Sequence, residues 1–270
     1  MHRKPALTDP YAKLAQELKD REKPLRQPLT WLFIVFMVAL ALLCAGLGYW
    51  QLQRLEQKQA LIAAVAERAS LPPIALPAVS EWEAFDPEVF NFRPVTLTGT
   101  FDYENTVFVF TALTEARGEK QGPGFWIMSP FDLEDGGTVI VNRGFVPQSA
   151  KDLFGNTSQD GSSPSKLITV GGIARVTEQV GPFTPGPDTP NRVEYVRTIE
   201  RLAIMMNLEV DSYAPIYVDQ GAGEKGLLPQ GGETVMSFPN RHLGYAMTWF
   251  GLAAVAIFMT LYWLWRQRRV

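Results

Sequence analysis

Two stretches without a charged side chain, Leu29–Trp50 and Leu243–Trp265, lie near opposite ends of the 270-residue chain. Each is longer than the ~20 apolar residues that an α-helix, rising ~1.5 Å per residue, needs to cross a ~30 Å hydrocarbon core. We therefore expect transmembrane helices at residues 29–50 and 243–265. The rest of the chain then divides into an N-terminal segment (1–28), a central domain (51–241) and a short basic tail (266–270).

The charges beside the two stretches indicate how the chain is oriented. Lys and Arg residues near the ends of a membrane span tend to stay in the cytoplasm. The first stretch is preceded by seven basic and four acidic residues, and the second is followed by three basic residues: Arg3, Lys4, Lys13, Lys19, Arg21, Lys23, Arg26, Asp9, Glu17, Asp20, Glu22, and then Arg266, Arg268 and Arg269. Both termini are therefore expected in the cytoplasm. The remaining 15 basic and 24 acidic residues leave the central domain with a net charge of −9.

The acidic central domain and the N-terminal sequence indicate where in the cell the protein lies and which kinds of partner it binds. An acidic surface repels phosphate backbones, so we expect no nucleic-acid partner. The first apolar stretch is followed by Tyr49-Trp50-Gln51 instead of a small-residue cleavage site, which indicates an uncleaved anchor. Residues 1–28 contain four acids and no Ser, unlike a mitochondrial transit peptide. These features predict a protein of the bacterial inner membrane, with its central domain in the periplasm and the lipid bilayer as one partner.

Cysteine and histidine are too scarce for several kinds of active site. Cys44 is the only cysteine, and His2 and His242 are the only histidines. The central domain (51–241) therefore contains neither cysteine nor histidine. A Ser-His-Asp site, a Cys-His site and a His-based zinc site are excluded there. We therefore expect that the protein is not an enzyme. A hydrolase based on a carboxylate pair stays open as an alternative, but no pair of acids is singled out by the sequence.

Helical patterns flank the first apolar stretch. Thr8-Asp9-Pro10 has the composition of a helix start, and a short helix is expected to end before Pro24. Beyond the stretch, apolar residues recur at three- and four-residue spacings through residues 51–69 until Pro72-Pro73. This pattern predicts that the anchor helix projects from the membrane.

From Phe92 the pattern changes to that of β-strands separated by turns rich in Gly, Pro, Asn and Asp. The expected strands are 95–99, 106–111, 125–131, 138–146, 167–177, 194–198 and 215–218, with loops at 154–166 and 221–232 and one helix at 198–208. The predicted fold is a membrane protein whose two transmembrane helices flank a mainly β domain (92–220), an antiparallel barrel or sandwich with one accessory helix.

Three segments carry a resemblance to a known family: Gly48–Arg54 (GYWQLQR), Val139–Pro147 (VIVNRGFVP) and Pro239–Phe250 (PNRHLGYAMTWF). With Phe92–Val95 and Phe183–Pro190, they resemble segments of the surfeit locus protein 1 (Shy-one) family. The resemblance extends from about residue 30 to 265, with the segments in the same order, and the two-span layout is also similar to that family.

The resemblance implies an assembly factor for haem–copper terminal oxidases, particularly cytochrome c oxidase. It also implies that haem a is the cofactor and that His242 is an iron ligand. The expected partner is the catalytic subunit of the oxidase, with haem a synthase as a further candidate. A cofactor-free scaffold that stabilises an oxidase assembly intermediate is the alternative.

The residues around His242 fit the implied site. On an α-helix Tyr245 and Trp249 follow His242 by three and seven positions, which places an imidazole and two aromatic rings on one face. Arg241 is suited to pair with a haem propionate, and Asn240 to cap the helix. A simpler interpretation stays open, because His, Tyr, Trp and Arg are also common anchors at a membrane surface.

Overall fold

The computed structural model describes residues 10–154, 166–236 and 238–267, with side chains from Pro28 onward. The chain divides into two units, Met1–Leu61 with Phe238–Val270, and Ile62–Ser237. Most of the predicted loop 154–166 lies outside the described residues.

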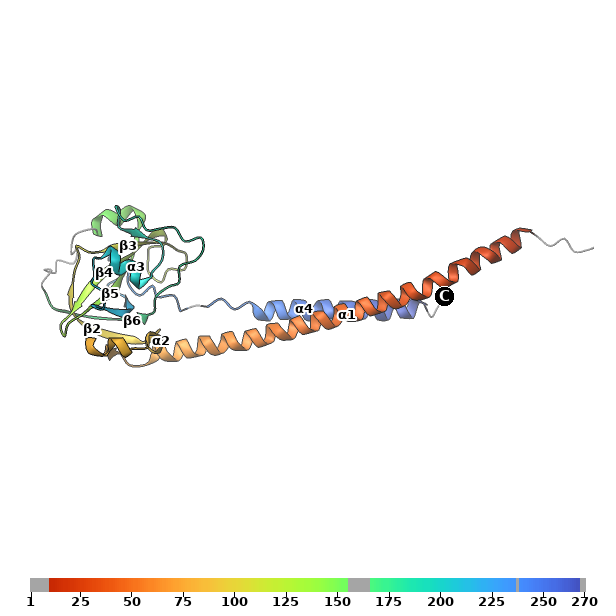
Figure 1. Ribbon diagram of the computed structural model, residues 1–270, viewed down its shortest axis with the longest axis horizontal. Helices are drawn as coiled ribbons and strands as arrows, with labels where there is room; N and C mark the ends of the chain where they lie inside the picture. The colour runs from red at the N-terminus through yellow and green to blue at the C-terminus, as the bar shows by residue number, and fades with distance from the viewer. Residues whose placement is uncertain (1–9, 155–165, 237, 268–270) are drawn as a thin grey trace, which may run out of the picture. The chain divides into compact units, whose positions relative to one another are not determined.

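The first unit contains two long helices that run alongside each other, α4 (His242–Gln267) and most of α1 (Pro10–Ser70) (Figure 1). Both are long and apolar enough to cross a membrane, by length and composition. The predicted helix end before Pro24 is wrong, because α1 continues through Pro24 and Pro28. Each proline lacks one backbone N–H, so α1 loses single hydrogen bonds at these positions without ending there.

Buried positions recur on both helices at alternating spacings of three and four residues. On α1 they are Met37, Ala41, Cys44, Gly48 and Gln51, and on α4 they are Ala246, Ala253, Ala256 and Thr260, with Trp249 partly buried. This is the period of helices packed side by side. Contacts such as Phe33 with Trp263 and Gln267 with Thr30 show that the two helices run antiparallel. We call this contact between α1 and α4 the seam.

The second unit is built on a closed mixed barrel of five strands. Around the barrel the strands follow the order β2, β6, β8, β5 and β4, and pairing of β2 with β4 closes it. Their bounds are β2 Pro94–Phe101, β4 Gly122–Leu133, β5 Thr138–Pro147, β6 Ile168–Arg175 and β8 Tyr213–Gln220. The sequence left barrel and sandwich open, and the structure is the barrel.

The pairing is not purely antiparallel, contrary to prediction. β5 pairs with β8 in parallel, as do two short edge strands, β1 (Ile74–Ala75) with β2 and β7 (Val193–Glu194) with β3 (Val107–Leu113). β7 is also shorter than the predicted strand 194–198. The backbone N–H of Arg197 donates to the side chain of Glu178 instead of to a neighbouring strand, and α3 (Ile199–Met205) begins directly afterwards.

Apolar side chains from all five barrel strands fill the barrel, among them Leu97, Phe131, Val141, Val170 and Ile216. A second cluster packs α3, the predicted accessory helix, against side chains of β3, β4, β5 and β8. Because β5 is covered on both faces, nearly all of its residues are buried, and buried and exposed residues do not alternate along it. Three further short helices, not predicted, are η1 (Val79–Ala84), α2 (Pro87–Phe90) and η2 (Gln148–Phe154).

Gly48→Ala should weaken the seam. A Cβ at Gly48 would lie 2.8 Å from the ring of Phe250, whereas a Cβ at Gly46 would meet nothing within 4 Å. Overpacking costs about 1–3 kcal/mol, while Ala for Gly in an open helix position gains up to about 1 kcal/mol. Unfolding of the detergent-solubilised protein by SDS should therefore shift in opposite directions for Gly48→Ala and Gly46→Ala. Equal shifts would contradict the tight contact.

Candidate functional site

His242 is the first residue of α4, at the end of the seam. Its backbone N–H donates to Oδ1 of Asn240 at 3.3 Å, so the predicted cap is confirmed. The cap orients the first turn of the helix and thereby the direction in which the imidazole leaves it. The ring is partly exposed.

The imidazole of His242 contacts α1 through Gln51. Nδ1 of His242 lies 2.8 Å from Oε1 of Gln51, whose side chain is buried in the seam. An amide oxygen only accepts hydrogen bonds, so in this arrangement Nδ1 carries the ring hydrogen and donates it. In the neutral imidazole with this hydrogen on Nδ1, the lone pair lies on Nε2. In the part of the chain that the structure describes, no residue makes a hydrogen bond or ion pair with this nitrogen.

A single imidazole suits a site that takes one protein ligand better than a metal site built entirely from side chains. Among the described residues there is no group of three or more His, Cys, Asp or Glu side chains able to hold a metal ion. One unprotonated imidazole nitrogen is what a haem iron takes from a protein, because the porphyrin already supplies the other nitrogens. The residues present therefore fit a haem held through His242.

The other residues predicted for the site differ in their surroundings. Arg241 is exposed, and the ring of Tyr245 is 56% exposed. Trp249 is partly buried and lies on the seam side of α4, between the buried Ala246 and Ala253. The structure thus leaves the side chains of Arg241 and Tyr245 accessible at the first turn of α4, and it places Trp249 against the helix pair.

Two cations of α1 that follow Gln51 are engaged by aromatic rings. The guanidinium of Arg54 lies 5.6 Å from the ring centroid of Trp50 and donates to Gln57. The ammonium of Lys58 lies 5.0 Å from the ring of Phe238. Cation–π contacts of this kind stabilise partly exposed side chains. These contacts give Arg54 and Lys58 structural partners within the first unit.

Gln51 was not among the residues predicted for the site. A signal for it is present in the sequence, because Gln51 continues the three- and four-residue spacing of Cys44 and Gly48 and is polar where the preceding positions are small or apolar. A polar residue at such a position usually has a partner on the facing helix. The identity of that partner depends on the register of two segments 191 residues apart.

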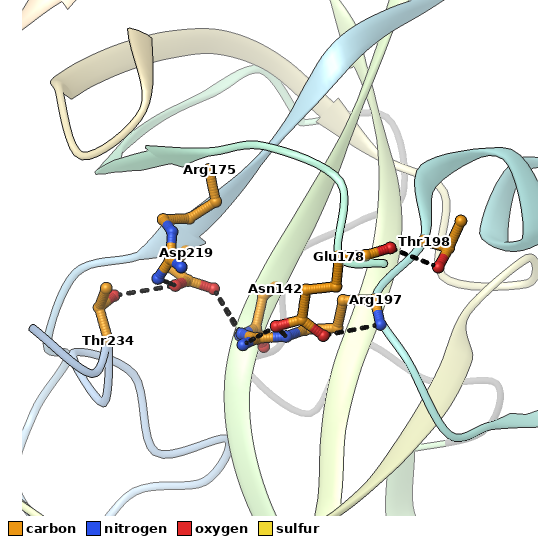
Figure 2. A network of polar contacts seen from close by, with 7 residues as sticks. All are labelled: Asn142, Arg175, Glu178, Arg197, Thr198, Asp219 and Thr234. Carbon is orange, nitrogen blue, oxygen red and sulfur yellow. Dashed lines mark hydrogen bonds and ion pairs between the residues drawn. The ribbon is translucent and has the colours of Figure 1, made fainter. Parts of the chain in front are cut away.

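The segment Val139–Pro147, which carries part of the resemblance, contributes to a buried polar network in the second unit. Asn142 on β5 donates to Asp219 on β8 at 2.8 Å, and Thr234 donates to the same carboxylate at 3.1 Å (Figure 2). Arg175 and Arg197 lie 3.7 Å and 3.4 Å from Asp219. Asp219 is only 3% exposed, so it is a buried anion held between two cations.

Arg197 joins this carboxylate to Glu178, as Figure 2 shows. Its guanidinium donates to Glu178 at 2.6 and 3.0 Å and lies over the rings of Trp126 and Tyr217. Burial alone would lower the pKa of Arg197, but nearby negative groups, including Asp219 and Glu178, raise it above its usual value. Burial alone would raise the pKa of Glu178, but the charge and hydrogen bonds of Arg197 lower it below 4.5. The ion pair between Arg197 and Glu178 is therefore charged at neutral pH.

The neighbours of Asn142 also have structural contacts. Gly144 has φ of +133°, and a Cβ there would clash with the backbone of Gln230. The guanidinium of Arg143 lies 4.6 Å and 5.3 Å from the rings of Tyr103 and Phe101. A hydrogen bond from Asn142 to Asp219, the close backbone approach at Gly144 and the ring contacts of Arg143 give these residues structural roles.

The second unit also has an open cavity of about 820 Å³ beside α3. Its lining includes four acidic side chains, Glu83, Glu88, Glu200 and Asp211. Partial burial and then the charges of Glu200 and Asp211 raise the pKa of Tyr213, which also lines it. The described residues that line this cavity include no Lys or Arg.

Two helices apolar enough to span a membrane and a closed mixed barrel between them in the sequence define a class of candidate membrane-anchored barrel proteins. The model of the SURF1 family matches residues 38–254. The chain belongs to the SURF1 family, which is generally linked to cytochrome c oxidase assembly.

Three relatives show how widely the similarity extends. Surfeit locus protein 1 of Rattus norvegicus is 32% identical over 86% of this chain and 74% of its own length. The Homo sapiens protein of the same name is 30% identical over 86% of this chain and 76% of its own length. A SURF1-like protein of Rickettsia bellii is 25% identical over 77% of this chain and 80% of its own length. The similarity therefore includes a bacterial relative.

Asp219→Ala should destabilise the barrel. It leaves Arg175 and Arg197 without their shared buried anion, and breaking a buried pair in this way costs about 3–5 kcal/mol. Asp135→Ala, in an exposed turn, is the matched control and should change the free energy of unfolding by no more than about 0.5 kcal/mol. Urea unfolding followed by near-ultraviolet circular dichroism measures both. Equal effects would show that the network does not stabilise the fold.

The ion pair of Glu178 should make the fold sensitive to acid. The pKa of Glu178 is lower in the folded state than the ordinary value of 4.5, so its stabilisation is fully present above pH 4.5 and is lost as the pH falls through the folded value. The free energy of unfolding of wild type should thus fall more steeply below pH 4.5 than that of Glu178→Gln. Parallel pH curves for the two proteins would contradict the lowered pKa.

Proposed function

We propose that this protein is a non-enzymatic assembly factor for haem–copper cytochrome c oxidase that holds haem a through His242 and assists its insertion into the catalytic subunit. Family membership supports the connection with the oxidase. The observation that supports the cofactor is the contact of His242 Nδ1 with Gln51, because in the neutral ring with its hydrogen on Nδ1 the lone pair lies on Nε2, and His242 is partly exposed.

Four of the residues between Arg241 and Trp249 would hold haem a. His242 would hold the haem iron through its imidazole nitrogen. The exposed guanidinium of Arg241 would pair with a propionate, and the rings of Tyr245 and Trp249 would provide apolar contact. A single protein ligand on the edge of a helix pair suits a cofactor that must leave again.

The proposal also includes a location and partners. We place the protein in a bacterial inner membrane, with both termini in the cytoplasm and the barrel in the periplasm, because Lys and Arg residues concentrate beside both spans. His242 then lies at the periplasmic end of its helix. The partners are the oxidase catalytic subunit, the lipid bilayer and, as a source of the cofactor, haem a synthase. No catalytic residue is assigned, because residues 62–237 contain neither His nor Cys.

His242→Ala should remove the bound haem a. The test compares absorption spectra of wild type and His242→Ala, purified in detergent from cells that also produce haem a. Leu243→Ala, at the neighbouring and more exposed position, is the matched control. We expect a haem a band in wild type and Leu243→Ala, and a lost or shifted band in His242→Ala. Wild-type protein without haem, or an unchanged band in folded His242→Ala, would overturn the haem site.

A cofactor-free scaffold is the second candidate function. Its supporting observation is that the contact with Gln51 explains His242 as a hydrogen bond between helices, without any ligand. The scaffold would act through its acidic barrel, and oxidase assembly would survive His242→Ala but not a barrel-disrupting change such as Asp219→Ala. Oxidase activity in membranes of the two variants separates this candidate from the haem site.

A further inference from the structure

Gln51 occupies an unusual position in the seam. It is the last buried position in the series Met37, Ala41, Cys44 and Gly48, and it is the only one of these five with a side-chain amide. Its side chain is 9% exposed. Burying an amide without a hydrogen bond is unfavourable, because the amide gives up its hydrogen bonds with water. The contact with His242 is therefore a strong local constraint on both side chains.

This contact determines two properties of the imidazole. Nδ1 lies 2.8 Å from Oε1, so this contact favours the neutral tautomer that has its hydrogen on Nδ1 and its lone pair on Nε2, and it limits rotation of the ring about its Cβ–Cγ bond. Histidines that bind metals generally donate the other ring N–H to an acceptor, which fixes the tautomer and raises the basicity of the ligating nitrogen. Gln51 satisfies this requirement from the facing helix.

We propose that Gln51 is the positioning residue for His242, a role that rests on the proposed haem site: its amide oxygen holds Nδ1 protonated and presents Nε2 as the ligating atom. Gln51 does not touch the cofactor in this scheme. It acts through the imidazole, so that packing of α1 against α4 sets the ligand strength of a residue on α4. The ligand and its acceptor come from the two separate apolar helices.

The variants Gln51→Met and Gln51→Glu separate the acceptor from the packing. Met has a similar length and shape but no strong acceptor, and Glu keeps an acceptor and makes it stronger by its charge. Gln53→Met, on the same helix at an exposed position, is the matched control. All four proteins are used as the full chain in detergent.

The first measurement needs no haem. Nitrogen NMR of labelled histidine distinguishes the two neutral tautomers of His242. Wild type and Gln53→Met should show hydrogen on Nδ1, and Gln51→Met should shift the population toward hydrogen on Nε2. An unchanged tautomer in Gln51→Met would overturn the proposal.

The second measurement titrates each protein with haem a. Loss of an acceptor behind a metal-binding histidine costs about 10- to 100-fold in affinity, so Gln51→Met should bind haem a more weakly by that factor while Gln51→Glu does not. The iron–histidine stretching frequency in the ferrous form should decrease in the order Gln51→Glu, wild type, Gln51→Met, because a stronger acceptor makes the imidazole a stronger ligand. Identical frequencies would show that Gln51 only packs the helices.

The two proposals fail in different ways. Wild-type protein that binds no haem a, or His242→Ala that binds it as tightly as wild type, refutes the haem site itself. Binding that is lost in His242→Ala but unchanged in Gln51→Met, with the same tautomer and frequency, refutes the role of Gln51 alone.

Discussion

The close approach of α1 and α4 is the constraint on which the first unit depends. Lipid tails are as apolar as the helices, so two membrane helices associate through packing and hydrogen bonds more than through the hydrophobic effect. Small buried residues, Gly48 on α1 and Ala246, Ala253 and Ala256 on α4, supply the packing. The contact between His242 and Gln51 supplies a hydrogen bond at one end of the seam. That contact engages Nδ1 of His242, and among the described residues no hydrogen bond or ion pair is made to Nε2.

The barrel depends on a different interaction, an ion network that links strands in its wall. Asp219, held by Asn142, Arg175 and Arg197, connects β8 with β5, β6 and the segment before α3. These contacts give a structural reason for the segment around Asn142-Arg143-Gly144, which carries part of the family resemblance. The two units therefore differ in role. The candidate ligand His242 lies on the helix pair, and residues 142–144 of the barrel make contacts that stabilise the fold.

Much of the fold was predictable from local sequence patterns, and the features that were not predicted have physical causes. The two long apolar helices and the strand at residues 95–99 depend on neighbours in sequence, and the structure has both, as α1 with α4 and as β2. The parallel pairing of β5 with β8 was missed because a strand's own sequence does not state the direction of its partner. The early end of β7 was missed because side chains accept the backbone N–H groups that follow it: Glu194 accepts that of Tyr195, and Glu178 accepts that of Arg197. His242 was predicted, but Gln51 was not, since their contact spans 191 residues.

The sequence by itself determined the two apolar helices, the β character of the domain between them, the family and the candidate ligand His242. Each of these follows from composition, from short-range spacing or from segments that are continuous in the chain. Tertiary structure alone decided that the barrel closes, that Asp219 lies between two arginines, and that Gln51 faces His242. These are contacts between distant segments, whose partners are set by the register of packed helices and strands and not by either segment alone.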